Sequence, residues 1–321
     1  SSSGLGGYDG GNGGVGGSSY GGALFNGGVA RLANTTLNEN ASMGGSGGSG
    51  GKGGSDGYYP PHSGADGGNG NTGGSGSGGG IYDLTGSCFL TNCTLAFNPA
   101  IAGTGGAAGP AGYGQFVPGS PGHPGASGSA SGGGINTSGG SFLINVLLAS
   151  NAPANVSGST IDGGHNLSSD SSCDFTQASS LSNSNAPLGP LLDNGGSTPT
   201  LALMPGNPAI DAGDDGAAPH ADQRGLLRPV GLASDIGAYE CGPPAIMTPP
   251  LSQNVAFGST VDFSAPAAGY PPLNYQWWFN GTNVIAGATN SVLHLVNVQL
   301  SHSGVYVLVV SNVFGAVTSS P

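Results

Sequence analysis

Glycine recurs at every third residue in several separate parts of this chain, and this period constrains the fold more than any other feature. Between residues 64 and 79 it stands at Gly64, Gly67, Gly70, Gly73, Gly76 and Gly79. The same phase recurs over residues 4–16, 44–53, 103–112 and 119–128. A flexible linker has no reason to keep such a phase, so we expect these runs to be ordered.

A repeat of three residues matches the polyproline II helix, which has three residues per turn and no internal hydrogen bonds. Glycine at each third position leaves one edge bare, so neighbouring rods can approach and satisfy one another's N–H and C=O groups. Two stretches hold paired runs and predict hairpins of antiparallel rods, 44–55 with 64–79 and 103–114 with 119–134. Collagen fits less well, because the runs are short, interrupted and mostly poor in proline.

Three apolar blocks, residues 32–40, 90–98 and 143–151, separate the glycine runs and share the pattern Leu-x-Asn-x-x-Leu-x-x-Asn. A glycine-flanked apolar residue precedes each block, namely Leu24, Ile81 or Ile135. One block cannot bury its own apolar side, whereas stacked blocks build a continuous column. Residues 1–154 therefore predict the rungs of a parallel β-solenoid with glycine-rich excursions between rungs. Asparagine is expected at the corners, where it tolerates left-handed backbone and bonds local backbone groups.

The net charge of the chain restricts the kinds of partner that it can bind. Sixteen acidic residues face four basic ones, for a formal net charge of −12, which argues against binding to nucleic acid or anionic membranes. No apolar stretch approaches the roughly 20 residues of a membrane span. The partners that remain are further copies of the chain, as a homo-oligomer, or a glycan.

Four cysteines, Cys88, Cys93, Cys173 and Cys241, allow three disulfide connectivities. None forms a CxxC pair, so a zinc site is not expected. We expect a disulfide between Cys173 and Cys241, with Cys88 and Cys93 either paired locally or buried as small apolar groups. A disulfide, with a single lysine and abundant Asn, Ser and Thr, predicts a secreted protein that is extracellular or on the cell surface.

Residues 155–242 lose the glycine phase and carry an ordered series of motifs, ending in Asp222-Gln-Arg-Gly225 and Asp235-Ile-Gly-Ala-Tyr-Glu240. The series resembles the conserved end of bacterial surface β-helix proteins of the choice-of-anchor Q or polymorphic outer-membrane-like type. That resemblance implies a right-handed solenoid. In that family a cysteine often precedes the Asp-Ile-Gly element, whereas here Ser234 stands there and Cys241 follows, which leaves the partner of Cys173 open.

A proline-rich boundary introduces residues 243–321, which resemble a bacterial immunoglobulin-like module. The strand at 275–281 carries a candidate core tryptophan, Trp277, and His302-Ser-Gly-Val-Tyr306 resembles the turn that holds the tyrosine corner. Phe263 and Leu308 stand where the intersheet cysteines would be, so the sandwich relies on packing. One more edge strand is expected beyond Pro321, and that strand is truncated, disordered or supplied by another subunit. The predicted fold class is thus all-β: a right-handed parallel β-solenoid with polyglycine/polyproline II helix bundle insertions, followed by an Ig-like β-sandwich.

The best carboxylate group in the sequence is Asp211, Asp214, Asp215, Asp222 and Asp235, near Arg224 and Arg228. We expect these aspartates to form turns and ion pairs. Calcium is the alternative, with Asp211, Asp214 and Asp215 as weak candidate ligands. The repeat blocks offer Glu39 alone, whereas a glycosidase needs two facing carboxylates. We therefore expect no catalytic residues and no other cofactor.

The prediction for function is an extracellular structural protein that assembles head to tail into a fibre or cell-surface layer. An adhesin or an ice- or glycan-binding protein is the alternative, because glycine-rich bundles of this phase resemble those of known antifreeze and phage-tip proteins. A polysaccharide lyase or hydrolase is the second alternative. The aromatic residues at the expected rod tips either contact a partner or cap the bundle: Tyr58, Tyr59, Tyr113 and Phe116.

Overall fold

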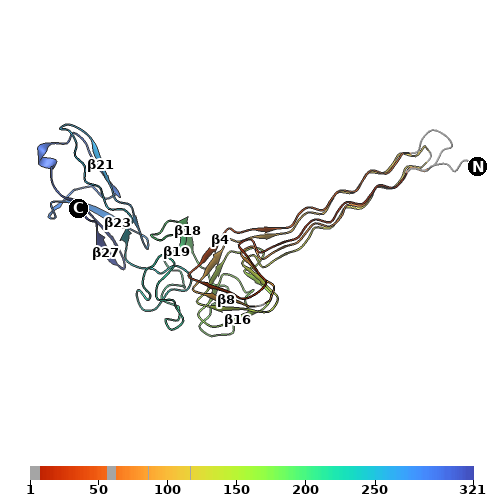
Figure 1. The fold of residues 1–321 in the computed structure, drawn as a ribbon, viewed down its shortest axis with the longest axis horizontal. Helices are drawn as coiled ribbons and strands as arrows, with labels where there is room; N and C mark the ends of the chain where they lie inside the picture. The colour runs from red at the N-terminus through yellow and green to blue at the C-terminus, as the bar shows by residue number, and fades with distance from the viewer. Residues whose placement is uncertain (1–7, 56–62, 86, 116) are drawn as a thin grey trace, which may run out of the picture.

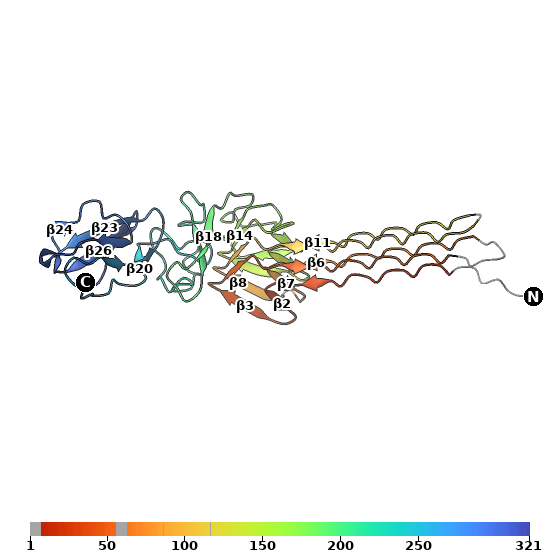
Figure 2. The ribbon, with the colours of Figure 1, turned by 90° about the horizontal axis from the view of Figure 1, so that it is seen from above.

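A computed structural model describes residues 8–55, 63–85, 87–115 and 117–321. The molecule is elongated and has three parts (Figure 1): a slender arm, a central body and a C-terminal domain. The arm and the C-terminal domain leave the body on opposite sides in both views (Figures 1 and 2). The described residues are all-β apart from one 3-10 turn, η1 (Leu300–His302).

Five extended segments form the arm, here named rods 1 to 5: residues 8–18, 44–55, 63–75, 102–114 and 117–129. Rods 1, 3 and 5 run toward the body and enter a parallel three-stranded sheet made of β1 (Ser19–Tyr20), β6 (Gly76–Ser77) and β11 (Ala130–Ser131). Rods 2 and 4 run away from it, starting at the paired strands β5 (Ser42–Met43) and β10 (Ala100–Ile101). The arm therefore has two layers of opposite chain direction.

Backbone hydrogen bonds join the rods at every third residue. Within a layer, the N–H of Gly13 donates to the carbonyl of Asn69 at 3.0 Å. Between layers, Gly48 donates to Gly14 at 2.7 Å, and Asn71 donates back to Gly48 at 3.1 Å. This spacing matches the three residues per turn of polyproline II and supplies the partners that such a helix lacks internally.

The close approach of the rods explains the glycines. A Cβ built on Gly70 would lie 2.1 Å from the carbonyl oxygen of Gly106, and one on Gly13 would lie 1.8 Å from that of Gly48. Neither position has room for a side chain. Backbone is thus the packing surface of the arm, as the glycine phase predicted.

The body holds three four-stranded parallel sheets, to which four successive units of the chain each contribute one strand. The first sheet pairs β2 (Leu24–Asn26), β7 (Ile81–Asp83), β12 (Ile135–Thr137) and β15 (Val156–Ser157). The second pairs β3 (Ala30–Ala33), β8 (Cys88–Thr91), β13 (Ser141–Ile144) and β16 (Thr160–Asp162). The third pairs β4 (Thr36–Asn38), β9 (Thr94–Ala96), β14 (Leu147–Ala149) and β17 (Leu167–Ser168). The rod hairpins leave after the first and second units (Figure 2).

Strand register aligns the repeated residues. Leu90 pairs with both Leu32 and Leu143 across the second sheet, and Leu37, Leu95 and Leu148 align likewise in the third. These leucines share one apolar cluster, in which Leu90, Leu95, Leu143 and Leu148 are fully buried. Equivalent positions of the sequence repeat therefore align across the parallel sheets in a stacked column.

The repeated asparagines occupy two corners. At the first, Asn34, Asn92 and Asn145 have positive φ angles of 48°, 45° and 54°, the left-handed region that asparagine tolerates. At the second, Asn98 donates to the side chain of Asn151 at 2.8 Å, and Asn151 donates to the carbonyl of Leu95 at 2.8 Å. The second corner is therefore a ladder of side-chain amides running along the column.

Residues 188–241 cover the outer side of the third sheet. They include the hairpin of β18 (Leu188–Leu192) and β19 (Thr200–Leu203), and they bury Leu147 and Ala149 against Leu201, Ile236 and Tyr239. The corner asparagines anchor the cover, since Asn92 donates to the carbonyl of Asp235 at 3.1 Å. The motif-rich segment thus packs along the side of the column.

The C-terminal domain pairs its strands as two small sheets and one larger sheet. The small sheets are β20 (Ala245–Ile246) with β22 (Ala267–Ala268), and β21 (Val261–Ser264) with β25 (Val292–Leu295). The larger has the order β24 (Asn283–Val284), β23 (Asn274–Phe279), β26 (Tyr306–Asn312), β27 (Gly315–Thr318). Trp277 is fully buried, and the Tyr306 hydroxyl donates to the carbonyl of His302 at 2.8 Å, which is the tyrosine-corner contact. Whether a further strand is missing beyond β27 stays a prediction.

Candidate binding surfaces

The outer face of rods 1, 3 and 5 carries side chains in straight rows, one residue from each rod. The rows are Asp9–Asp66–Ser120, Asn12–Asn69–His123, Val15–Thr72–Ala126 and Ser18–Ser75–Ser129. Asn12 accepts from the N–H of Asn69 at 2.9 Å, and Asn69 accepts from the N–H of His123 at 2.7 Å. The polar side chains of these rows therefore hold the rods together as well as facing solvent.

Only one of the four predicted tip aromatics lies within the described residues. Tyr113 is 75% exposed, and the Lys52 amine lies 5.4 Å from its ring centroid, within reach of a cation–π contact. Tyr58, Tyr59 and Phe116 lie outside the described residues. A contact role for the tip stays a prediction.

An aromatic cluster that the sequence analysis missed lies where rod 1 joins the body. The ring of Tyr82 stacks on Phe25 with centroids 5.5 Å apart and contacts Tyr20 at 4.8 Å. Phe25 and Tyr82 are register partners on β2 and β7, on the outward side of the first sheet. The alternation of these strands, which buries Ile81 and leaves Tyr82 accessible, was the signal that could have found it.

The predicted carboxylate group divides into two parts. Asp222 and Asp235 join a buried ionic network with the two arginines: Arg224 contacts Asp222 at 2.7 Å, and Arg228 contacts Glu240 at 2.6 Å. Burial raises the pKa of Asp235 to about 6 and that of Glu240 to about 7, because a charged carboxyl loses its hydration there. Glu240, the last residue of the motif Asp235-Ile-Gly-Ala-Tyr-Glu240, also belongs to this ionic network, and the sequence analysis did not include it.

Asp211, Asp214 and Asp215, the weak calcium candidates, bind backbone instead of converging. Their carboxylates accept from the N–H groups of Leu232, Gly216 and Ser234 at 2.9, 2.9 and 2.7 Å, respectively. Within the described residues no group of three or more His, Cys, Asp or Glu side chains could hold a metal ion. The geometry favours the turn-forming role over calcium coordination.

All four cysteines are free and buried. Cys88, Cys93 and Cys173 belong to the apolar cluster inside the column, whereas Cys241 belongs to the cluster under the cover. The expected disulfide between Cys173 and Cys241 is therefore not supported, because these two residues fill different cores. Burial raises the pKa of the Cys88, Cys93 and Cys173 thiols to about 12, so they remain protonated and unreactive near neutral pH.

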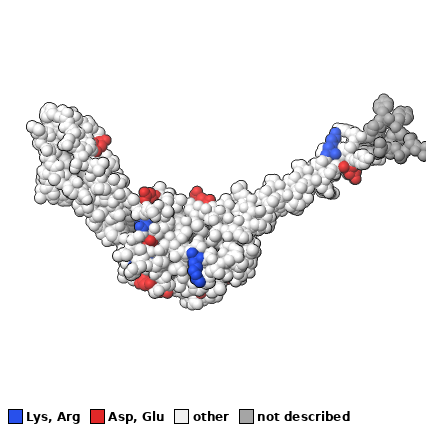
Figure 3. All heavy atoms as spheres, in the orientation of Figure 1, with Lys and Arg blue, Asp and Glu red and all other residues white. Residues whose placement is uncertain are grey.

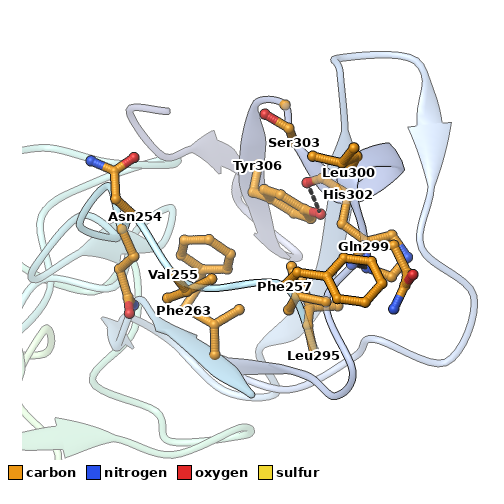
Figure 4. Close-up of a pocket in the computed structure, with 14 residues that line it drawn as sticks. Asn254, Val255, Phe257, Phe263, Leu295, Gln299, Leu300, His302, Ser303 and Tyr306 are labelled. Atoms are coloured by element: carbon orange, nitrogen blue, oxygen red, sulfur yellow. Dashed lines mark hydrogen bonds between the residues drawn. The ribbon is translucent and has the colours of Figure 1, made fainter. Parts of the chain in front are cut away.

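The C-terminal domain has a hollow of about 370 Å³ beside η1, at the end of the molecule remote from the arm, and its lining mixes apolar side chains with polar ones such as Asn254, Gln299 and Ser303. Figure 4 shows Phe257, Phe263, Leu295 and Tyr306 around it, with Leu300 at its rim. Phe257 is 73% exposed and Leu300 is 87% exposed. Large apolar side chains gathered on a surface mark interaction sites more often than isolated ones do.

Charged side chains are few on the face drawn in Figure 3, and no basic patch gathers there. Among the described residues no helix is long and apolar enough to cross a membrane.

Comparison with known proteins bears on the C-terminal domain. Residues 243–312 match the family model of the immunoglobulin domain, in agreement with the buried tryptophan and the tyrosine corner. A search of curated proteins finds no match to the chain.

Proposed function

We propose that this chain is an extracellular structural protein whose copies join head to tail into a fibre or cell-surface layer. The observation that carries the proposal is the hollow of the immunoglobulin-like domain, at which the large apolar side chains of Phe257 and Leu300 are exposed. It lies at the end of an elongated molecule, opposite a stiff arm. A hollow that holds the body or arm of the next copy would make a chain of copies that does not close on itself.

The architecture supports a scaffold. The three parallel sheets are best explained as the faces of a right-handed β-solenoid, and the rods as polyglycine II helices. Among the described residues, backbone hydrogen bonds of the chain itself join the rods to one another and the strands to one another. The carboxylates near Arg224 and Arg228 are engaged in ion pairs and backbone contacts, which favours a structural role over that of a polysaccharide lyase or hydrolase.

The test is assembly as a function of concentration, followed by sedimentation velocity and negative-stain electron microscopy. Leu300→Asp and Phe257→Asp place a charge in the hollow and should abolish filaments. Leu232→Asp is the matched control, because Leu232 is an equally exposed leucine at 91% but belongs to the cover of the body. The proposal fails if the unaltered protein stays a single particle at high concentration, or if the control variant blocks assembly equally.

Adhesion to a glycan is the second candidate, and the Tyr20–Phe25–Tyr82 cluster favours it. Exposed aromatic rings offer flat apolar faces with a polar rim, which suit the faces of sugar rings. A glycan array should then report binding that is lost in Phe25→Ala and kept in Tyr113→Ala. Equal loss in both variants, or no binding at all, would rule out this cluster as the site.

A further inference from the structure

One side of rod 5 carries a straight row of exposed prolines. Pro118, Pro121 and Pro124 stand at every third position, and all three are exposed. The other two positions of each triplet have different neighbours: a Cβ on the glycine would meet rod 3, and the residue after the glycine belongs to the outer rows. The three prolines therefore form a surface of their own, here named the proline ridge.

The proline ridge is closed to a further rod but rich in hydrogen-bond acceptors. Proline has no N–H with which to pair a neighbouring rod, and its ring fills the space that such a rod would need. The carbonyl groups of Pro118, Pro121 and Pro124 accept no hydrogen bond from the described residues. Rod 5 forms one side of the arm (Figure 2), and the chain continues from it through β11 into the third unit of the column. The ridge thus offers apolar rings and carbonyl oxygens together.

The ridge is ordered before a partner arrives. The N–H groups of Gly119, Gly122 and Gly125 donate to rod 4 at 3.1, 2.9 and 2.8 Å, which fixes the backbone of rod 5 on both sides of each proline. Proline-rich segments with a period of three bind aromatic-lined grooves, because a preformed extended helix loses little conformational entropy on binding. A partner for this ridge should therefore combine aromatic side chains with hydrogen-bond donors.

The hollow of the immunoglobulin-like domain has this combination. The rings of Phe263 and Tyr306 stack with their centroids 4.9 Å apart, and Phe257 exposes its ring beside them (Figure 4). Asn254 and Ser303 also line the hollow. An amide N–H and a hydroxyl are donors that a proline carbonyl can accept. The hollow therefore has the chemistry of a groove that binds prolines.

The two surfaces also agree in charge. Residues 117–125 contain no Asp, Glu, Lys or Arg, and none of these four residue types lines the hollow. The chain as a whole has a formal net charge of −12, so two copies repel one another over most of their surface. A contact between two uncharged surfaces avoids placing like charges in the joint.

The ridge and the hollow of one copy lie apart. The arm and the C-terminal domain leave the body on opposite sides (Figures 1 and 2), so the ridge of one copy can reach only the hollow of another. Because the ridge and the hollow are different surfaces, each joined copy keeps one of them free at either end. Contacts of this kind extend into an open chain of copies.

We infer that the proline ridge of rod 5 is the segment that fills the hollow of the next copy. This inference rests on the proposed head-to-tail assembly and names the part of the arm that makes the joint. The rings of Phe263 and Tyr306 receive the proline rings, while Asn254 and Ser303 donate to the carbonyls between them. A different part of the arm, or a groove on another protein, is the competing partner that the experiment distinguishes.

The first measurement is binding of a fluorescent peptide of residues 117–125 to the full chain, followed by anisotropy. The unaltered chain should bind it saturably, and Leu300→Asp should abolish binding. Changing Pro121 and Pro124 of the peptide to alanine should weaken binding on the order of tenfold for each proline, because the Cγ and Cδ methylenes no longer enter the hollow. A peptide of residues 103–111, equal in length but with one proline, is the control and should not bind.

The second measurement is filament formation by full-length variants. Pro121→Ala combined with Pro124→Ala should abolish filaments, whereas Pro110→Ala, an exposed proline of rod 4 outside the ridge, should leave them intact. Ser127→Pro extends the ridge by one triplet at an exposed position and should lower the concentration at which filaments appear. Unchanged circular dichroism spectra would show that all of these variants fold.

The outcomes separate this inference from the proposed function. Filaments that survive the double alanine variant, or that Pro110→Ala blocks equally, overturn the inference and leave head-to-tail assembly by another part of the arm. Failure of the peptide to bind, or binding that Leu300→Asp does not reduce, also overturns it. Peptide binding at the hollow by a chain that never forms filaments would support the contact between ridge and hollow and refute the proposed fibre.

Discussion

The guanidinium of Arg228 lies 2.6 Å from the carboxylate of Glu240, and the two side chains are 1% and 0% exposed. Arg228 also donates to the carbonyls of Asp235 and Gly237, while Glu240 accepts from the N–H of Val230. The pair therefore ties residues 235–240 of the cover to the loop that holds Arg228 and Val230. Because both side chains have several buried partners, removing either one alone leaves polar groups unsatisfied and lowers the free energy of unfolding.

Replacement of Arg228 by methionine should lower the free energy of unfolding by about 3–5 kcal/mol, because it leaves a buried carboxylate without its counter-ion. Arg31→Met is the control, since Arg31 lies over the Phe89 ring at 4.3 Å on the outer face and such a contact is worth about 0.5–1 kcal/mol. Denaturant unfolding of both variants measures the difference. Equal losses would contradict the assigned role of the pair.

The asparagine ladder predicts a position-dependent cost. Asn151→Ala removes contacts to Asn98, to Leu95 and to Asn155 and should cost about 1–3 kcal/mol for each partner left unsatisfied. Asn40→Ala, at the first-unit end of the ladder, removes one side-chain hydrogen bond to Asn98, keeps the bond from the Asn40 N–H to Asn98, and should cost less. Thermal unfolding of the two variants decides, and a larger loss at Asn40 would refute the ladder as a stabilising element.

The arm should be sensitive to single methyl groups. Gly70→Ala places a Cβ 2.1 Å from the carbonyl oxygen of Gly106 and should cost about 1–3 kcal/mol by overpacking. Faster amide hydrogen exchange in rods 3 and 4 would reveal this loss of stability. Gly14→Ala is the control and should leave exchange in the arm unchanged, because its Cβ meets nothing within 4 Å.

Asp162 predicts a dependence of stability on pH. Partial burial raises its pKa, but hydrogen bonds from Gln177, Ser180, Asn166 and Gly164 outweigh burial and hold the pKa below the model-peptide value of 3.8. A carboxyl with a lowered pKa in the folded state contributes stability above about pH 4 and loses it as the pH falls through the folded-state value. Asp162→Asn should therefore destabilise the protein at neutral pH and less so at about pH 2. A difference that is constant with pH would count against this contribution.

Much of the column and arm could be predicted from the sequence because both rest on periods. Glycine at every third residue has one steric cause, and leucine and asparagine at fixed spacing stack in register. The tyrosine corner followed from a local motif in the same way. Such features depend on residues close together in the chain, or on repeats that align with themselves.

The contacts of the cysteines, the cover and the hollow could not be predicted in this way. Cys173 and Cys241 are distributed between two cores by the path of residues 188–241, which runs along the column instead of closing its end. The trench that Leu37, Leu191 and Gln223 line beside β4 and the hollow beside η1 arise where segments distant in sequence meet. A local sequence period does not predict such long-range contacts.

Backbone supplies the packing between the rods, whereas the outer rows supply the exposed surface and add side-chain hydrogen bonds between neighbouring rods. Because each third residue faces outward and backbone carries the packing, the outer rows can change in chemistry without repacking a core. The arm can also change in length, but only by whole triplets inserted at matching levels in neighbouring rods. The outer rows can therefore vary in composition where their side chains make no bonds between rods, whereas the length of the arm changes in steps of three residues.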